Sequence, residues 1–210
     1  MKDQETIINS KGKILRFLLL LGFLLISMSM LPAQRAEAAS TKSSALKAYK
    51  VFLKNAQKSD GKGKKFALAY VNNDTIPELY YNGCLYTYKK GSVIALSEDA
   101  LYDENFQIDT YYKKTGVAVL SYSYGPVDVY FYYKLTGGQL KLIMTYEIEY
   151  TLDSGGNVTG VTYSYYTDSK SLTKAAFDKK LKNLVGSKKA KTFTSSSYKN
   201  TSANRNKYLK

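Results

Sequence analysis

Apolar residues change their spacing twice along the chain, and these changes divide it into segments. Over residues 41–59 they recur every three or four positions, which is the period of an amphipathic helix. From Phe66 to Tyr166 they alternate with polar residues, and β-branched and aromatic side chains predominate, as in strands. Helical spacing returns over residues 174–185. We therefore expect an α+β fold in which an antiparallel β-meander is flanked by an N-terminal and a C-terminal amphipathic helix.

The first predicted helix has a clear apolar stripe and a clear end. Leu46, Tyr49 and Leu53 fall on one face, and lysines occupy much of the remaining surface. Asp60-Gly61 follows, and glycine readily takes the left-handed conformation that ends a helix. The stripe predicts that this face of the helix is buried.

Four segments of the meander share one shape, in which an aromatic-rich run, a short turn rich in lysine or glycine, and an apolar run follow one another. They cover residues 85–96, 110–122, 131–143 and 150–163. The turns contain residues that hairpins need at positive φ, namely Lys90-Gly91, Thr115-Gly116, Gly137-Gly138 and Gly155-Gly156. We interpret the segments as successive hairpins, which gives about eight or nine strands over residues 66–166. Such a meander would form a twisted sheet, a partial barrel or a fragment of a propeller.

The C-terminal region predicts one helix and a docked tail. Thr173 is a suitable N-cap residue for a helix over residues 174–185, and Gly186 is suited to end it. After a connection rich in Lys, Ser and Thr, residues 200–209 predict a last short helix, whose Tyr208 and Leu209 dock back onto the domain.

Residues 1–38 have the pattern of a secretory signal peptide. A basic start precedes an apolar run over residues 14–31, and Ala36-Glu37-Ala38 offers small residues where a signal peptidase reads them. The apolar run is also long enough to span a bilayer, so a retained membrane anchor is the alternative. With cleavage, residues 39–210 form a single secreted domain that has no integral membrane segment and is large enough to bury a core.

The numbers of cysteine and histidine residues limit the kinds of catalysis and metal binding that the chain can support. The chain has no His, which excludes Ser-His-Asp catalysis, Cys-His catalysis and His-ligated zinc. Cys84 is the only cysteine, and it is either a small buried residue on a strand or a residue that pairs between chains. We therefore expect no enzymatic activity and no catalytic residues. A carboxylate-based hydrolase using Glu147, Glu149 or Asp128 is the alternative, because the two glutamates alternate on one strand face.

Charge is distributed unevenly along the chain. Residues 39–65 carry eight Lys against one Asp, a net charge of +7, and residues 66–168 carry six Lys against twelve carboxylates, a net charge of −6. Residues 169–210 carry twelve Lys and Arg against one Asp, a net charge of +11. Outside the cell, basic ends suit an anionic cell-wall polymer, an anionic membrane surface or an acidic partner. The alternative is that the lysines only keep helix surfaces solvated.

Nucleic acid is not an expected partner of this basic chain. Arg205 is the only Arg after residue 38, so the arginine forks that grip bases and phosphates are nearly absent.

Tyrosine is unusually frequent, with 21 Tyr and no Trp in the chain. Candidates for an outward tyrosine face in the middle of the meander are Tyr122, Tyr124, Tyr130 and Tyr132. Exposed Tyr offers rigid, amphipathic contact area, which suits a glycan or an extracellular protein. The alternative is that these rings only populate a sheet surface that aromatic side chains fit well.

The turn after the first strand has the pattern of a calcium-binding loop. Counted from Tyr70, Asn72, Asp74 and Glu78 stand at positions 3, 5 and 9, and the carbonyl of Ile76 stands at position 7. Hard cations take oxygen ligands from such positions. These four residues are therefore candidate ligands for weakly bound calcium.

Two residues depart from the pattern of such a loop. Tyr70 stands where position 1 usually supplies a carboxylate, and Thr75 stands where position 6 is usually Gly. The alternative interpretation is an Asx-type turn, in which Asn72 and Asp74 accept hydrogen bonds from backbone N–H groups.

The segment Asn72–Leu79 resembles the D-x-N-x-D-G-x-P-E-L segment of secreted proteins from Gram-positive bacteria, and the calcium loops of FG-GAP/VCBS propeller repeats. The order of an N-terminal helix, this loop, a Tyr-rich meander and a tail with Asn200-Thr201 and Ala203-Asn204-Arg205 is also similar to that secreted group. The resemblance implies an architecture rather than an activity.

Together these features predict a secreted, basic, tyrosine-rich protein that binds a ligand at the cell surface or in the extracellular medium. The two alternatives are a calcium-stabilised structural protein with a degenerate ion loop, and the carboxylate-based hydrolase.

Overall fold

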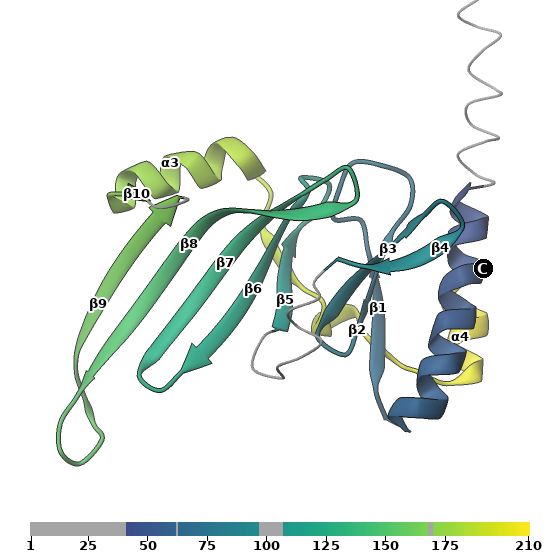
Figure 1. Cartoon of the computed structure of the whole chain (residues 1–210), viewed down its shortest axis with the longest axis horizontal. Coiled ribbons are helices and arrows are strands. Elements are labelled where there is room, and N and C mark those ends of the chain that lie inside the picture. Colours follow the sequence, from purple (N-terminus) through teal and green to yellow (C-terminus); the bar gives the residue numbers. More distant parts are fainter. Residues whose placement is uncertain (1–40, 62, 97–106, 168–169) are drawn as a thin grey trace, which may run out of the picture. The chain divides into compact units, whose positions relative to one another are not determined.

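The chain has the predicted α+β fold, with an antiparallel meander between its helices. The computed structural model describes residues 41–61, 63–96, 107–167 and 170–210, so the predicted signal peptide at residues 1–38 lies outside the described residues. Residues Lys42–Lys210 form one compact unit. In its described part, the strands β1 to β9 follow one another along the chain between residues 65 and 167 (Figure 1).

The meander strands are mostly four to ten residues long. They are β1 (Lys65–Ala69), β2 (Glu78–Tyr81), β3 (Cys84–Lys89), β4 (Ser92–Ala95), β5 (Gln107–Tyr112), β6 (Val117–Tyr124), β7 (Val127–Thr136), β8 (Gln139–Leu152) and β9 (Val158–Thr167). The C-terminal region adds three shorter strands, β10 (Lys170–Ser171), β11 (Ala190–Thr192) and β12 (Tyr198–Lys199).

The described helices are the helix over residues 41–60, α3 (Lys174–Val185), the 3₁₀ turn η1 (Thr194–Ser196) and α4 (Ser202–Tyr208). None of the helices in the described ranges is long and apolar enough to cross a membrane.

The strands form two sheets, where the sequence predicted one twisted sheet, a partial barrel or a propeller fragment. The order is β12-β1-β2-β3-β4 in a five-stranded sheet and β10-β9-β8-β7-β6-β5-β11 in a seven-stranded sheet. The pairs are antiparallel, and β12 and β11 extend the two sheets beside β1 and β5. One C-terminal segment therefore supplies an edge strand to each sheet.

The four predicted hairpins are confirmed. Their turns connect β3 to β4, β5 to β6, β7 to β8, and β8 to β9. Gly137 and Gly138 both have positive φ values, which give a two-residue turn the twist of the strands it joins. β8 takes part in two hairpins, because its fourteen residues pair with β7 on one side and with β9 on the other.

Backbone hydrogen bonds join the two sheets. The Lys114 N–H donates to the Tyr70 carbonyl over 2.8 Å, and the Gly116 N–H donates to the Val71 carbonyl over 2.7 Å. The loop between β1 and β2 is therefore held against the turn between β5 and β6.

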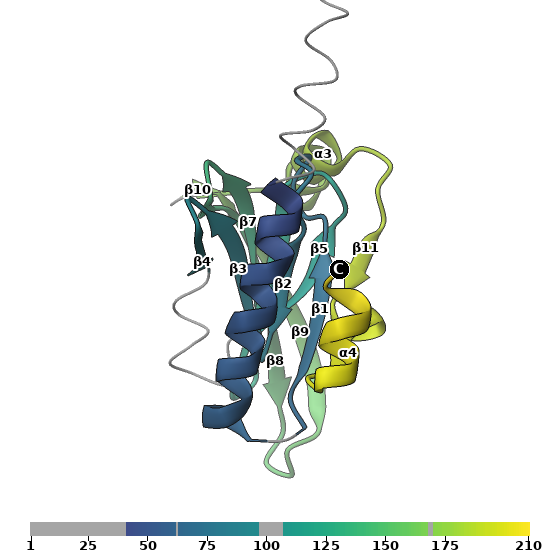
Figure 2. The same ribbon diagram turned by 90° about the vertical axis from the view of Figure 1, so that its right-hand side faces the viewer.

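The helix over residues 41–60 lies on the five-stranded sheet, with α4 beside it (Figure 2). Its predicted apolar stripe is confirmed, because Leu46, Tyr49 and Leu53 are buried. They belong to the main hydrophobic core together with strand residues such as Phe66 and Leu79.

Polar side chains fasten the C-terminal tail to this helix. Asn200 is buried, and its Nδ2 donates to the Leu53 carbonyl over 2.8 Å. The Arg205 guanidinium, also buried, donates to Asn200 Oδ1 over 2.6 Å and to Gln57 Oε1 over 2.8 Å. Leu209 is buried as well, so the prediction that the tail docks back is confirmed.

α3 begins and ends where the sequence predicted. The Thr173 hydroxyl accepts from the Ala176 N–H over 3.2 Å, which caps the first turn. Phe177 is buried between the helix and the seven-stranded sheet, with its ring centroid 5.4 Å from that of Tyr132 and 5.2 Å from that of Tyr165.

Replacing Asn200 with Ala tests how the tail is fastened. The variant deprives the buried Arg205 guanidinium of a close acceptor, so we expect the free energy of unfolding to fall by about 2 kcal/mol. Urea unfolding followed by circular dichroism measures the loss. Asn183→Ala, on the exposed surface of α3, is the control and should change the free energy by less than about 0.5 kcal/mol. Equal losses in the two variants would contradict the role of Asn200.

Candidate functional site

Side chains of the loop between β1 and β2 form hydrogen bonds within the loop itself. Asn72 Oδ1 accepts from the Asp74 N–H over 3.0 Å, and Asp74 Oδ1 accepts from the Ile76 N–H over 2.8 Å. Asn72 Nδ2 also donates to Asp74 Oδ2 over 2.8 Å. These are the hydrogen bonds of Asx turns, which was the alternative interpretation of the sequence.

Glu78, unlike the exposed Asp74, is completely buried. Its Oε2 accepts from the Val71 N–H over 2.9 Å, whereas its Oε1 has no hydrogen-bond partner among the described residues. From the helix side, the Tyr49 hydroxyl donates to the Pro77 carbonyl over 3.0 Å. The pKa of Glu78 is raised to about 7, mainly by burial; the Val71 N–H opposes the shift, and the charge of Asp74 adds to it.

The buried carboxylate lies where the two sheets meet. Val71 donates its N–H to Glu78, and its carbonyl accepts from Gly116 of the seven-stranded sheet's β5–β6 turn. Val71 therefore connects the Glu78 side chain to both sheets. We call the loop over residues 70–77, with its contacts to Glu78 and to the β5–β6 turn, the joint.

The predicted calcium ligands make hydrogen bonds within the loop, and a cation at these residues stays a prediction. The side-chain oxygens of Asn72 and Asp74 already accept hydrogen bonds from the loop. Tyr70 stands at the first ligand position, and the Lys42 ammonium lies 5.6 Å from its ring centroid. Glu78 Oε1, which has no hydrogen bond to any described residue, is in a fully buried side chain. Over the part of the chain that the structure describes, no three His, Cys, Asp or Glu side chains are placed to hold a metal.

The four candidate tyrosines do not form one face. Across the β6–β7 hairpin, Tyr122 pairs with Val129, whereas Tyr130 pairs with Ser121. Paired residues point to the same side of a sheet, and neighbours along one strand point to opposite sides. The expectation of a single tyrosine face is therefore wrong. The two faces carry Tyr122 with Tyr124, and Tyr130 with Tyr132.

Tyr130 and Tyr132 belong to an aromatic cluster that α3 partly covers. Tyr130, Tyr146 and Tyr165 form one cross-strand row, with neighbouring ring centroids 5.5 Å and 5.1 Å apart. Phe177 of α3 contacts Tyr132, and burial raises the pKa of the Tyr132 hydroxyl above its usual value. These rings therefore contribute to packing beneath the helix.

The carboxylates of the hydrolase alternative do not all converge. Asp128 pairs with Ile148, which stands between Glu147 and Glu149, so Asp128 lies on the opposite face from both glutamates. The Asp128 carboxylate also accepts from the Tyr150 hydroxyl over 2.8 Å. The geometry gives no support to a catalytic pair that includes Asp128.

Cys84 is a free, buried cysteine on β3. Burial raises the pKa of its thiol, which opposes formation of the reactive thiolate. Its surroundings agree with the interpretation of a small buried strand residue.

The structure exposes an apolar surface that the sequence did not single out. We define the distal arm as residues 121–129 and 147–164, the part of the seven-stranded sheet that extends beyond the aromatic cluster under α3 (Figure 1). Five of the eight exposed large apolar side chains in the described residues lie on this arm. Leu152, Val158, Val161 and Tyr163 share one face of the sheet, and Tyr124 lies on the opposite face.

β9 is also an open edge along much of its length. β10 pairs with it at Tyr166 and Thr167, and the Leu172 N–H donates to the Tyr165 carbonyl. From Val158 to Ser164, no strand of the described ranges pairs with the outer side of β9. Edge strands usually carry charges or Pro that block further pairing, but β9 has neither. The signal in the sequence was the uncharged run VTGVTYSYYT.

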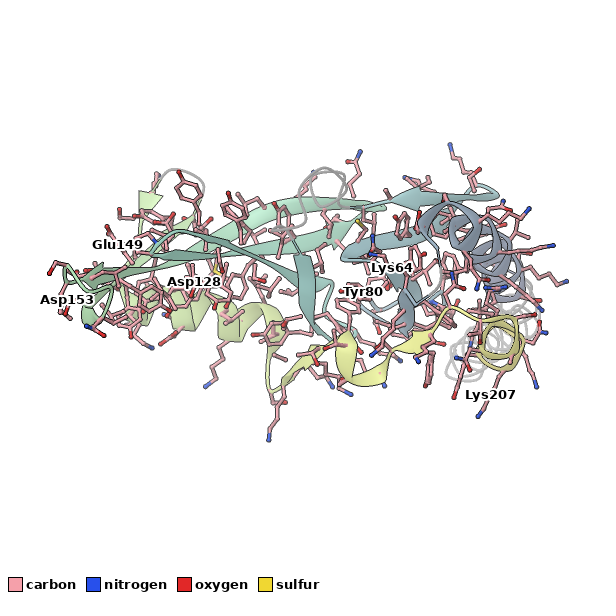
Figure 3. All side chains as sticks on the ribbon, turned by 90° about the horizontal axis from the view of Figure 1, so that it is seen from below. Lys64, Tyr80, Asp128, Glu149, Asp153 and Lys207 are labelled. Atoms are coloured by element: carbon pink, nitrogen blue, oxygen red, sulfur yellow. The ribbon has the colours of Figure 1, made fainter. Side chains whose placement is uncertain are left out.

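The distal arm differs in charge from the rest of the described unit. It contains no Lys or Arg, and its carboxylates are Asp128, Glu147, Glu149 and Asp153. Figure 3 shows Asp128, Glu149 and Asp153 on this arm, and Lys64 and Lys207 in the other half of the described unit. Asp128 shares a face with the exposed Val161 and Tyr163, whereas Glu147 and Glu149 lie on the opposite face, so the arm as a whole is acidic.

Comparisons with known proteins add no assignment, since no family model, curated protein or solved structure matches the chain.

Glu78 makes the stability of the joint depend on pH. Its raised pKa means that the folded state binds the proton more tightly than the unfolded state does, so the stabilisation is fully present below about pH 4.5. We expect up to roughly 3 kcal/mol of it to be lost as pH rises through about 7. Urea unfolding at a series of pH values measures this loss.

Glu78→Gln should remove that pH dependence, because glutamine is neutral in both states. Glu149→Gln, on the exposed part of β8, is the control and should leave the curve unchanged. A wild-type curve that coincides with that of Glu78→Gln between pH 4.5 and pH 7 would contradict the burial of an ionisable Glu78.

Calcium should not stabilise the fold through this loop. A ligand that binds only the folded state raises the unfolding midpoint once its concentration exceeds its dissociation constant. We expect equal midpoints for the full chain in EDTA and in millimolar calcium, with magnesium as the control ion. A saturable rise with calcium that Asp74→Ala abolishes would show that the loop is a cation site after all.

Proposed function

We propose that the protein is a secreted, non-enzymatic binding protein whose partner contacts the distal arm. The observation that carries the proposal is a sheet surface that α3 leaves uncovered, with exposed Leu152, Val158, Val161 and Tyr163 side by side on β8 and β9. Exposed apolar patches on monomeric proteins commonly mark interaction sites. Secretion is supported by the signal-peptide pattern of residues 1–38.

A protein partner fits this surface better than a glycan does. The tyrosine rings of the row Tyr130, Tyr146 and Tyr165 stack on one another, so their faces are turned toward neighbouring rings. Flat ring faces are what a sugar would stack on, whereas edges, hydroxyls and aliphatic side chains suit protein side chains. The exposed residues around the row include Val158 and Val161, which are aliphatic.

The open edge of β9 favours a partner in extended conformation. Between Val158 and Ser164 its outer backbone groups are available for strand addition, in which main-chain hydrogen bonds supply affinity and alternate side chains supply specificity. The four carboxylates of the arm, with no Lys or Arg among them, favour a segment that carries Lys or Arg. The partner class is therefore a basic, extended segment of another protein.

The lysine-rich regions have a separate role in this proposal. Residues 39–65 and 169–210 are strongly basic, and the lysines of the helix over residues 41–60 lie mainly on its exposed side. Such a surface holds the protein near an anionic wall polymer or membrane, with an attraction that salt weakens. The distal arm, which is acidic, would then bind the protein partner.

Selection from a displayed library of random peptides tests the partner class. Peptides that bind the full chain should be rich in Lys or Arg and in β-branched residues. Val161→Lys places a positive charge on β9 and should weaken binding of a selected peptide by roughly tenfold. Isothermal titration calorimetry with that peptide measures the change.

The chain offers a closely matched control for this variant. Leu142 on β8 lies outside the distal arm and is 42% exposed, against 41% for Val161. Leu142→Lys should leave peptide binding unchanged. Equal effects of the two substitutions, or selected peptides that are acidic, would contradict the proposal. A dimer that Val161→Lys dissolves in sedimentation velocity would instead assign the edge to a second copy of the chain.

A further inference from the structure

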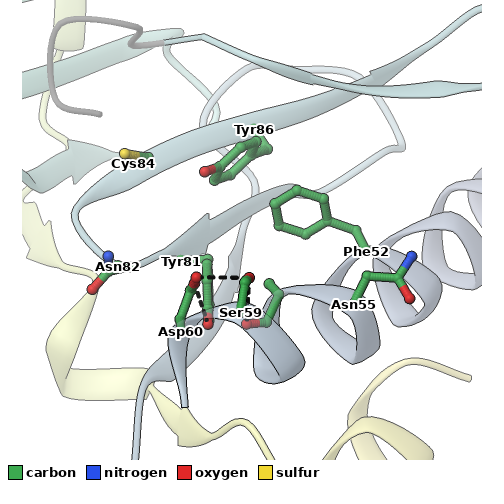
Figure 4. A pocket seen from close by; sticks show the side chains of 9 residues that line it. Phe52, Asn55, Ser59, Asp60, Tyr81, Asn82, Cys84 and Tyr86 are labelled. Carbon is green, nitrogen blue, oxygen red and sulfur yellow. Dashed lines mark hydrogen bonds between the residues drawn. The ribbon is translucent and has the colours of Figure 1, made fainter. Parts of the chain in front are cut away.

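A cavity of about 540 Å³ lies between the helix over residues 41–60 and the β2–β3 hairpin (Figure 4). Its wall combines aromatic rings with amide, hydroxyl and carboxylate groups. The residues that matter here are Phe52, Asn55 and Asp60 from the helix and Asn82 and Tyr86 from the hairpin. The cavity is remote in sequence from the distal arm and shares no residue with it.

Asp60 is held in place on the wall by two hydroxyl groups. Ser59 Oγ donates to one carboxylate oxygen over 2.9 Å, and the Tyr81 hydroxyl donates to the other over 3.0 Å. Both oxygens keep further acceptor capacity, because an ionised carboxylate accepts about four hydrogen bonds. A ligand in the cavity therefore meets an acceptor that is already oriented.

The aromatic rings of the wall lie at large angles to one another. The Phe52 ring lies 4.7 Å from the Tyr86 ring at 51°, and 6.1 Å from the Tyr81 ring at 88°. Because Tyr81 and Tyr86 are buried while Phe52 is half-buried, Phe52 offers the larger exposed aromatic surface to a ligand. Figure 4 shows Asn55 and Asn82 at opposite ends of this group.

The composition of the wall selects a class of ligand. An apolar ligand would desolvate Asp60, Asn55 and Asn82 without offering them hydrogen bonds. An anion in direct contact would meet the Asp60 carboxylate, and no lining residue is Lys or Arg. A small cation would have to approach through a region of net charge +7. A neutral, polyhydroxylated group with an apolar face satisfies the amides, the carboxylate and the ring together.

We propose that this cavity binds a neutral sugar residue of an anionic glycan. The sugar places its apolar face on Phe52 and its hydroxyls on Asp60, Asn55 and Asn82. Lys54 and Lys58 adjoin lining residues on the same helix and are exposed, so anionic groups elsewhere on the glycan lie within their field. This site goes beyond the proposed function, because it uses different elements and a different class of ligand from the distal arm.

Binding to polymers that differ only in their sugar tests the site. The probes are poly(glycerol phosphate) chains that carry glucose, galactose or N-acetylglucosamine, and the same chain without sugar. At least one sugar-bearing chain should bind the full-length protein roughly tenfold more tightly than the bare chain, as measured by surface plasmon resonance. Equal affinities for the bare chain and all three sugar-bearing chains would overturn the proposal.

Two conservative variants separate the cavity from the lysines around it. Phe52→Leu keeps an apolar side chain but removes the ring, and Asn82→Gly keeps the turn, in which Asn82 has a φ of 51°, but removes the amide. Each should abolish the preference for the sugar and leave binding of the bare chain unchanged. Lys54→Gln should weaken binding of both polymers. A sugar preference that survives both cavity variants would also overturn the proposal.

Val51→Ala is the matched control, because Val51 adjoins Phe52 on the helix and is 60% exposed outside the cavity wall. It should change neither affinity. Since the distal arm takes no part in these measurements, failure of the sugar site leaves the test with Val161→Lys independent of it.

Discussion

The seven-stranded sheet is longer than the helix that covers it. β8 has fourteen residues and spans roughly 46 Å, whereas α3 has twelve residues and is roughly 18 Å long. Phe177 and Val185 anchor this helix to the sheet near the Tyr132 end, so the strands beyond it keep the α3-side face uncovered. The exposed valines and leucine of the distal arm follow from this mismatch in length. The edge of β9 is open because β10 is only two residues long and pairs only with Tyr166 and Thr167. A surface that the fold leaves uncovered is available to a partner.

Hydrogen bonds at the β1–β2 loop connect the seven-stranded sheet, which carries the arm, to the five-stranded sheet. Val71 connects the buried Glu78 carboxylate to the β5–β6 turn, while Tyr49 holds the Pro77 carbonyl from the helix side. The loop that resembles a calcium site in sequence thus works through hydrogen bonds and a buried carboxylate. Its Asn72 and Asp74 serve the backbone of the loop itself.

Local signals explain what the sequence predicted well. Thr173 fixes the start of α3 through one hydrogen bond, and Gly137-Gly138 fixes a turn through positive φ, so neighbours along the chain suffice. The tyrosine face failed because it depends on register between strands. Tyr122 pairs with Val129, so residues of even number in β6 share a face with residues of odd number in β7. The division into two sheets and the burial of Glu78 depend on contacts distant in sequence, which a periodic pattern does not contain.

Amide hydrogen exchange along β9 tests the central claim, that this edge is open in the free protein and is the contact for a partner. In the free chain, amides between Val158 and Ser164 that point away from β8 should exchange rapidly, whereas those of β7, paired on both sides, should be protected. Addition of a selected basic peptide should slow exchange at the outer β9 amides. Protection of those amides in the free chain, or no change when the peptide binds, would contradict the account.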